Sequence, residues 1–345
     1  MNKKFIALAV AAAVAPAAFA GDEVILYGQV NVAAVVDNTK DSLFKIDGQS
    51  SRIGVKGTES LGNGMSAWFQ IESKVAPDDA SASGFATREG WVGLKGDFGG
   101  VQLGRGKSAF TKAYEEFDLW YQADSFAPFD YGLQTYNDSG LVPVMVDADG
   151  NRNDAGYQYR TDNTVRYTYA AEGLDVTVDY AVGENKNDST KTKEATNLSY
   201  SVKGTLGDYW YIVGANMGRN LRMNGSKLNN LLLGGGTTFG DLAVGAGFTR
   251  SVFSEAGYGT GKRNSYILNA SYALEGNSLY GGVIVGDKLK HNIGKLEDSR
   301  FVRYGAGLAV PLSKRTNIVT EYMATNFSGA TKDTSYFSVG AYHSF

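Results

Sequence analysis

The sequence predicts an all-β protein, a transmembrane antiparallel β-barrel of about sixteen strands. Apolar and polar residues alternate along many short segments, and short connections between these segments alternate with long ones. The chain has 345 residues with 44 glycines, five prolines and no cysteine, and no Pro/Ser-rich linker divides it. Because a period of two gives every segment one apolar and one polar face, we expect a single large sheet.

Residues 1–20 are expected to be a cleaved signal peptide. Lys3 and Lys4 precede an apolar run that ends in Ala18-Phe19-Ala20, the order of a secretory signal with its cleavage site. Residues 21–345 would then form the mature barrel. The formal net charge of the chain is −3, and loss of the two signal lysines makes it −5. This balance gives no reason to expect nucleic acid as a partner.

The first expected strand, residues 24–36, shows the alternation. Leu26 and Val30 lie on one face, and Tyr27, Gln29 and Asn31 lie on the other. The remaining strands are expected near residues 51–60, 66–74, 85–96, 100–107, 156–171, 174–183, 195–206, 209–219, 229–239, 242–253, 263–274, 278–287, 300–312, 315–327 and 334–345.

The connections between these strands fall into two classes. SLGNG, EG and PLSK are short turns, whereas GENKNDSTKTKE and GRNLRMNGSK are long and polar. Short periplasmic turns at one end and long extracellular loops at the other are typical of an outer-membrane barrel. Closure also explains the polar faces, because a sandwich would bury their Asn, Gln, Lys and Arg side chains without partners.

Aromatic residues near strand ends fit interfacial girdles as well as they fit ordinary β-propensity. They are Tyr157, Tyr159, Tyr209, Trp210, Tyr211, Tyr266, Tyr322, Phe327, Tyr336 and Phe337.

Residues 108–155 break the alternation. This stretch is dense in aromatic and acidic residues, and it is too long for a structureless connection without a function.

Several ordered motifs resemble the general trimeric porins of the Gram-negative outer membrane, most closely their beta-proteobacterial branch. The matching stretches are LYGQVNVA, SSRIGVKGTESLGNGMSAWFQIE, REGWVGLKGDFGGVQLGRGKS, NTVRYTYAAEGLDVTVDYA and FSVGAYHSF. The resemblance implies a cell outer-membrane channel for passive diffusion of ions and small hydrophilic solutes. It also implies a homotrimer in contact with outer-membrane lipid and lipopolysaccharide, with the C-terminal Phe345 as a signal to the assembly machinery. No enzymatic activity, cofactor or metal is expected.

In that family the long third loop folds into the barrel and narrows it, which places 108–155 at a constriction. The candidate acidic residues are Glu115, Glu116, Asp118, Asp124 and Asp130. By motif position, the candidate basic wall consists of Arg52, Lys56, Arg166, Arg88, Arg105 and Lys107. Opposed acidic and basic rows would create a transverse field for solutes, while the residues leave the ion preference open.

Strand parity supports only part of this basic wall. Arg52, Lys56 and Arg166 lie opposite the apolar positions of their strands, so they should point into water. Arg88 and Arg105 share the parity of apolar residues. A basic side chain facing lipid near the bilayer midplane costs about 2–4 kcal/mol. These two residues are therefore expected at a strand end, at a bulge or in a subunit contact.

Parts of the sequence are also compatible with three other functions. A substrate-specific channel would use loop aromatics as a slide, namely Tyr114, Phe117, Trp120, Tyr121, Phe126, Phe129, Tyr131 and Tyr136. A surface adhesin would bind a partner through the long loops. A hydrolase would need His343, whose parity directs it toward lipid. Asp147 and Asp149 imitate the start of a calcium loop, but Arg152 occupies the position of its glycine.

Overall fold

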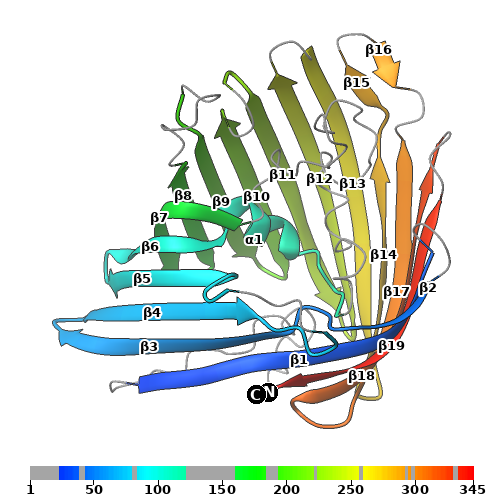
Figure 1. The fold of residues 1–345 in the computed structure, drawn as a ribbon, viewed down its shortest axis with the longest axis horizontal. Coiled ribbons are helices and arrows are strands. Elements are labelled where there is room, and N and C mark those ends of the chain that lie inside the picture. The colour runs from blue at the N-terminus through cyan, green and yellow to red at the C-terminus, as the bar shows by residue number, and fades with distance from the viewer. Residues whose placement is uncertain are drawn as a thin grey trace.

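The strands form one closed sheet. The computed structural model describes residues 23–38, 43–79, 84–121, 160–183, 193–220, 224–255, 259–291, 294–296, 300–328 and 333–345. Within these ranges nineteen antiparallel strands form a continuous sheet around a central space, the lumen (Figure 1). The signal-peptide prediction lies outside the described residues. No helix in the described ranges is long and apolar enough to cross a membrane.

The first six strands are β1 (Glu23–Asp37), β2 (Leu43–Asp47), β3 (Arg52–Gly62), β4 (Met65–Lys74), β5 (Glu89–Gly96) and β6 (Gly99–Lys107), and α1 (Ala109–Glu115) follows them. After α1 come β7 (Arg160–Ala171), β8 (Leu174–Val182), β9 (Thr196–Leu206), β10 (Tyr209–Arg219), β11 (Lys227–Phe239), β12 (Leu242–Glu255) and β13 (Gly259–Leu274). The last strands are β14 (Asn277–Gly286), β15 (Leu289–His291), β16 (Gly294–Leu296), β17 (Phe301–Pro311), β18 (Thr316–Phe327) and β19 (Thr334–Ser344).

Sixteen of these strands form the barrel wall, as the sequence predicted, while the short strands β2, β15 and β16 extend its loop end. The barrel closes because β1 pairs with β3 through Glu23–Gln29 and with β19 through Gln29–Asp37. Two backbone hydrogen bonds of 3.1 Å join Gly28 and Phe345 at this closure. The first and last strands are therefore paired with each other, and the described wall has no open sheet edge at this closure.

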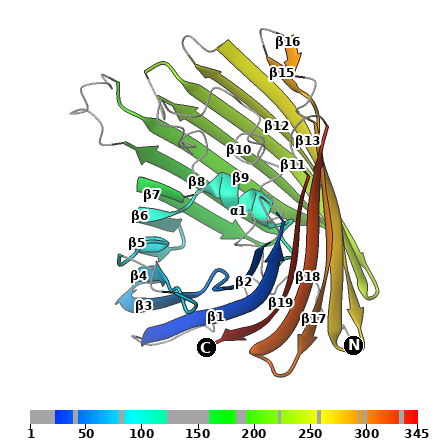
Figure 2. The ribbon, with the colours of Figure 1, turned by 45° about the vertical axis from the view of Figure 1, so that its right-hand side comes forward.

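The two ends of the barrel differ as the turn pattern predicted. Tight turns join β7 to β8 and β13 to β14, and Gly173 and Gly276 adopt φ values of +69° and +87° there, which a side chain would disfavour. The longer connections, including the one that carries α1, leave the opposite end. β5 and β6 have 8 and 9 residues, whereas β12 and β13 have 14 and 16, so the wall is lower at β5 and β6 than at β12 and β13 (Figure 2).

Apolar side chains cover the outer face of the wall. On β13, Tyr266 and Leu268 point outward with 45% and 56% of their surface exposed, while Ser265 and Asn269 are buried on the inner face. Of the aromatic residues predicted for the girdles, Tyr209, Tyr211, Tyr266, Tyr322 and Phe337 are exposed outward. Trp210, Phe327 and Tyr336 pack against the inner cluster, which corrects their placement. Tyr157 and Tyr159 lie outside the described residues.

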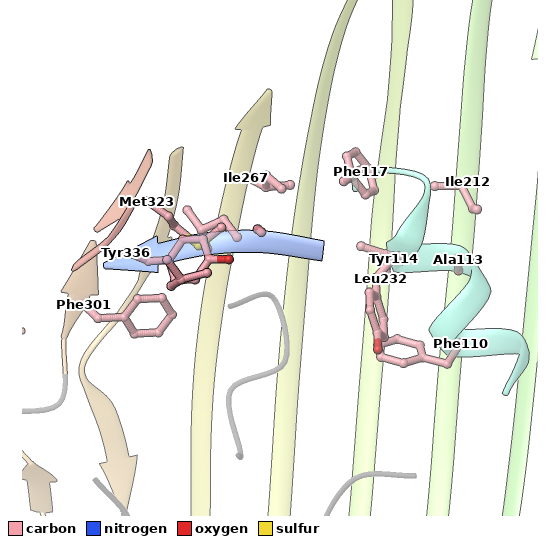
Figure 3. Close-up of a cluster of buried hydrophobic side chains, with 13 residues drawn as sticks. Phe110, Ala113, Tyr114, Phe117, Ile212, Leu232, Ile267, Phe301, Met323 and Tyr336 are labelled. Carbon is pink, nitrogen blue, oxygen red and sulfur yellow. The ribbon is translucent and has the colours of Figure 1, made fainter. Parts of the chain in front are cut away.

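The lumen contains an apolar cluster, an exception to the rule that inner faces are polar. Ile212, Leu232 and Ile267 point inward from β10, β11 and β13 and are at most 3% exposed. Phe110, Ala113, Tyr114 and Phe117 from α1 and the residues after it pack on this part of the wall (Figure 3). The apolar inner positions therefore hold the loop instead of facing water.

The candidate pore constriction

α1 begins directly after β6, where the chain leaves the barrel wall and turns into the lumen. The Ser108 hydroxyl accepts a hydrogen bond of 3.1 Å from the Thr111 amide and caps the helix. Two further amides donate to the barrel wall: Ala109 N to Asp179 Oδ2 at 2.6 Å and Phe110 N to Ser199 Oγ at 3.0 Å. The first turn of the helix is thereby attached to β8 and β9.

The apolar positions of the loop follow a helical period. Phe110, Ala113, Tyr114 and Phe117 are spaced i, i+3, i+4 and i+7, so they form one stripe that packs on the wall. The wall makes room for this stripe: a Cβ on Gly234 of β11 would lie 2.3 Å from Phe117 Cζ. The opposite side of α1 carries Lys112, which is exposed to the lumen.

The chain then crosses the lumen toward β18 and β1. Asn269 donates to the Phe117 carbonyl at 2.7 Å, and the Tyr121 amide donates to Glu321 Oε1 at 2.7 Å. The Asn31 side chain on β1 donates to the Tyr121 carbonyl. Side chains on β8, β9, β13, β18 and β1 thus fix residues 109–121 inside the barrel, as expected for a third loop that folds inward.

Arg52 and Arg88 surround one buried carboxylate on the low side of the wall. Arg88 Nε lies 2.7 Å from Glu72 Oε1, and Arg52 Nε lies 3.7 Å from Glu72 Oε2. The Tyr27 hydroxyl also donates to Glu72, at 3.2 Å. Lys56 Nζ lies 5.3 Å from the centre of the Tyr27 ring. These cations all point inward, Arg52 and Lys56 from β3 and Arg88 from the position directly before β5.

Arg166 points inward but is only 1% exposed. Its Nε and Nη2 donate to the two oxygens of Asp179 at 2.6 and 2.8 Å, and its guanidinium carbon lies 4.5 Å from the Trp91 ring centre. Because Asp179 also accepts from the Ala109 amide, Arg166 positions the carboxylate that holds the start of α1. Arg166 therefore contributes to the shape of the opening more than to the charge that water reaches.

Each described acidic candidate on the loop has a neutralising neighbour or a raised pKa. Glu115 Oε1 lies 2.7 Å from Lys107 Nζ, and Glu116 Oε2 lies 2.6 Å from Lys203 Nζ. Burial, reinforced by repulsion from Glu115 and Glu321, raises the pKa of Asp118 to about 7, although the Trp120 amide donates to its Oδ1 at 3.0 Å. Asp124 and Asp130 lie outside the described residues.

Arg88 and Arg105, the two arginines with outward parity, have different surroundings. Arg88 comes directly before β5, at a strand end, and turns inward to Glu72. Arg105 lies at a register shift between Gly104 and Gly106 and pairs with Asp162. It lines an outer depression with Leu103 and Val165, which are 53% and 48% exposed. Arg105 therefore does not belong to the basic wall of the lumen, because the shift leaves it on the outer face.

A cleft separates α1 from the low side of the wall and collects most of the basic candidates. Arg52, Arg88, Lys107, Lys112 and Arg166 line it together with Glu72 and Glu89, two tryptophans, two polar side chains of β4 and β6, and Thr168. Strand parity predicts the direction of Arg52 and Arg166, but four important residues were not predicted from the sequence: Lys112, Glu72, Asp179 and Glu321. The helical stripe from Phe110 to Phe117 was the signal that could have placed Lys112 on the water-facing side of a helix.

The other proposed sites are also partly described. Tyr114 and Phe117 are fully buried and cannot contact a passing solute, whereas Trp120 and Tyr121 are partly buried. Phe126, Phe129, Tyr131, Tyr136 and the calcium-like run at Asp147 and Asp149 lie outside the described residues. His343 is exposed on the outward parity of β19, and its Nδ1 lies 2.9 Å from Thr316 Oγ1.

Comparison with known proteins identifies the family. A family model described as Gram-negative porin matches residues 7–330. Outer membrane porin protein 32 of Delftia acidovorans is 30% identical over 342 residues, which cover 92% of this chain and 87% of the relative.

Two solved structures show the same fold. The anion-selective porin from Comamonas acidovorans superposes with a TM-score of 0.78 at 23% identity and covers 94% of this chain and 100% of its own. The trimer form of OmpT, an outer membrane protein of Vibrio cholerae, has a TM-score of 0.70 at 16% identity with 94% and 100% coverage. This chain belongs to the Gram-negative porin family and forms an outer-membrane channel through which solutes diffuse passively.

Proposed function

We propose that the cleft between α1 and the low side of the wall is the narrowest part of the channel and that it favours anions. The observation that carries this proposal is the sign of the side-chain charges in the lumen that have no described ion-pair partner. Lys112 and Lys56 point into the lumen and form no ion pair with any described residue, while Glu115 and Glu116 are each paired with a lysine.

The two opposed rows of charge are thereby unequal. Arg52 shares Glu72 with Arg88 and keeps a quarter of its side chain exposed, which adds a positive charge to the opening. Positive charge along a narrow passage lowers the energy of a permeating anion and raises that of a cation. The solved Comamonas acidovorans porin, described as anion-selective, has the same fold and supports this preference.

The reversal potential under a salt gradient tests the proposal. A unit charge about 4 Å from an ion in water contributes roughly 1 kcal/mol, equal to about a fivefold change in the permeability of that ion. Because the effect has opposite signs for an anion and a cation, we expect Lys112→Gln to lower the anion-to-cation permeability ratio by up to about 25-fold. Lys314→Gln, on the short turn after β17, removes the same charge away from the cleft and should leave the ratio unchanged. If Lys112→Gln matches the wild type, the cleft does not control permeation.

We also propose that the chain acts as a homotrimer and that transport is its only activity. The relative described as a trimer form supports the first statement. The outward pair Arg105–Asp162, next to exposed Leu103 and Val165, is a surface suited to a subunit contact. Sedimentation of the protein in detergent should give the mass of three chains, and a monomer would contradict the proposal. We propose in addition that the C-terminal Phe345 is the signal that the outer-membrane assembly machinery recognises.

A further inference from the structure

Two tryptophans line the cleft, and they differ in their surroundings. Trp91 is 4% exposed: its Nε1 donates to Glu89 Oε2 at 2.6 Å, and the Arg166 guanidinium lies over its ring. Trp68 lies on β4 and stays partly exposed. Within the described residues, the Trp68 side chain makes no hydrogen bond and no ring or cation contact. Trp91 therefore has a structural role, whereas the indole of Trp68 is available to a solute.

The strand pattern directs Trp68 into the cleft. On β4 it shares the parity of Glu72, whose carboxylate is paired with Arg88 inside the barrel. Trp68 pairs with Gly93 of β5, and a Cβ on Gly93 would lie 2.8 Å from Trp68 Nε1. The indole therefore extends over β5 because this position is a glycine. The wall is thus shaped to place the indole at the surface of the cleft.

Gln102 of β6 continues the same row of the sheet. It pairs with Gly93 on one side and with Arg166 on the other, and it lines the cleft. Gln102 is 7% exposed, and its side chain forms no hydrogen bond to a described residue. A nearly buried amide costs free energy unless water or a solute reaches it. Gln102 therefore offers a donor and an acceptor to a solute that lies on Trp68.

The charge and the size of the cleft restrict the class of solute. Lys112 lines the cleft from α1, and Lys56 lies diagonally across the β3–β4 pair from Trp68. The face of an indole attracts cations, but these two lysines and Arg52 repel them. The volume of the cleft is about 260 Å³, slightly below the range of about 300–1,000 Å³ for pockets that hold drug-sized ligands. The cleft therefore suits an anion with a single ring.

We propose that the cleft selects aromatic carboxylates among anions: the ring of the solute stacks on Trp68, and its carboxylate faces Lys112. An inorganic anion gains nothing from an indole, and an aliphatic carboxylate lacks the ring contact. Such binding is weak, and a weak site along a diffusion path lets a solute both enter and leave. The inference rests on the proposed anion preference of the same cleft and adds a preference among anions to it.

Inhibition of the chloride current by benzoate and by cyclohexanecarboxylate, measured in planar bilayers, tests the proposal. The two anions have the same charge and the same number of carbon atoms, but only benzoate is aromatic. Benzoate should halve the current of the wild type at a lower concentration than cyclohexanecarboxylate. Trp68→Leu should raise this concentration for benzoate roughly two- to tenfold, the range for one aromatic pair, and leave it unchanged for cyclohexanecarboxylate. Trp68→Phe keeps a ring and should keep most of the difference.

Phe69→Leu is the matched control. Phe69 lies on the same strand and also packs over a glycine, Gly57, but it has the outward parity. This variant should be inhibited by both carboxylates like the wild type. The anion-to-cation permeability ratio in potassium chloride should be the same in Trp68→Leu and in the wild type, whereas Lys112→Gln should lower it. Failure of this inference is thereby distinguished from failure of the anion preference.

Two results would overturn the proposal: inhibition of the wild type by both carboxylates at equal concentrations, or a loss in Phe69→Leu equal to that in Trp68→Leu. The first comparison needs no variant, so it decides even if Trp68→Leu does not fold. The single-channel conductance in potassium chloride verifies that each variant forms a pore.

Discussion

The inner wall of the barrel has two unlike halves. From β3 to β8 it presents Arg52, Arg88, Trp91 and Arg166 to the cleft, held by the carboxylates of Glu72 and Asp179. From β10 to β14 it presents a set of apolar side chains: Ile212, Leu232, Ile267 and Ile284. The outer faces of both halves alternate in the same way, so the difference arises from what covers the inner faces.

The loop residues 109–121 pack against the apolar half, whereas the charged half lines the water-filled cleft. Phe110, Tyr114 and Phe117 bury the inner side chains of β10 and β11, and this packing places α1 on that side of the lumen. The remaining space lies next to the low wall, where the basic residues are. In the proposed mechanism, selectivity therefore depends on an apolar contact on the side opposite the charges that a solute meets.

The largest expected effect comes from breaking the buried ion pair of the charged half. Arg166→Met leaves the Asp179 carboxylate without its charged partner at 0% exposure, and removal of one member of such a pair costs about 3–5 kcal/mol. We expect a lower free energy of unfolding in urea. The double variant with Asp179→Asn removes the stranded charge and should recover part of the loss. A double variant as unstable as the sum of the two single changes would contradict the coupling.

On the apolar half, Phe117→Ala empties the space beside Gly234. Truncation of a fully buried Phe costs about 3–5 kcal/mol, but here it weakens the attachment of the loop rather than the strand ladder. We expect higher single-channel conductance, weaker anion preference and an unfolding midpoint closer to that of the wild type than in Arg166→Met. Leu119→Ala, a change at a partly buried position nearby, serves as the control. Unchanged conductance in Phe117→Ala would mean that this contact does not set the width of the pore.

The smallest expected effect is a pH dependence at Asp118, between the two halves. Because burial raises its pKa from 3.8 in the unfolded chain to about 7, the protonated form is favoured in the folded protein. Its contribution to stability is thus greatest below pH 3.8 and is lost as the pH rises to about 7. In the folded protein Asp118 loses its proton near pH 7 and adds a negative charge to the loop, so anion preference should fall as the pH rises through 7.

Reversal potentials measured across this pH range test the assignment. Asp118→Asn should remove the part of the pH dependence near pH 7 and leave the part at higher pH that belongs to Lys112, because burial lowers the pKa of Lys112 to about 8. Glu115→Gln, which removes a carboxylate paired with Lys107, should retain both parts. If both variants titrate like the wild type, another group is responsible.

The sequence alone determined the wall of this protein. Alternation in segments such as 24–36, and the glycine turns between hairpins, require strands with one apolar face, and short turns fix which segments are neighbours. These are local constraints, and they predicted the sixteen-stranded wall and the inward direction of Arg52, Lys56 and Arg166. They also predicted that Arg88 and Arg105 would need a strand end, a bulge or a subunit contact.

Only the tertiary structure decided how the lumen is filled. Pairing of Arg166 with Asp179, of Glu115 with Lys107 and of Tyr121 with Glu321 joins residues on distant strands, and no local period encodes such contacts. Strand parity tells whether a side chain points inward, but it does not tell whether it meets water, a carboxylate or the loop. That choice depends on where residues 109–121 cross the barrel, and the apolar inner side chains of β10, β11 and β13 set that path.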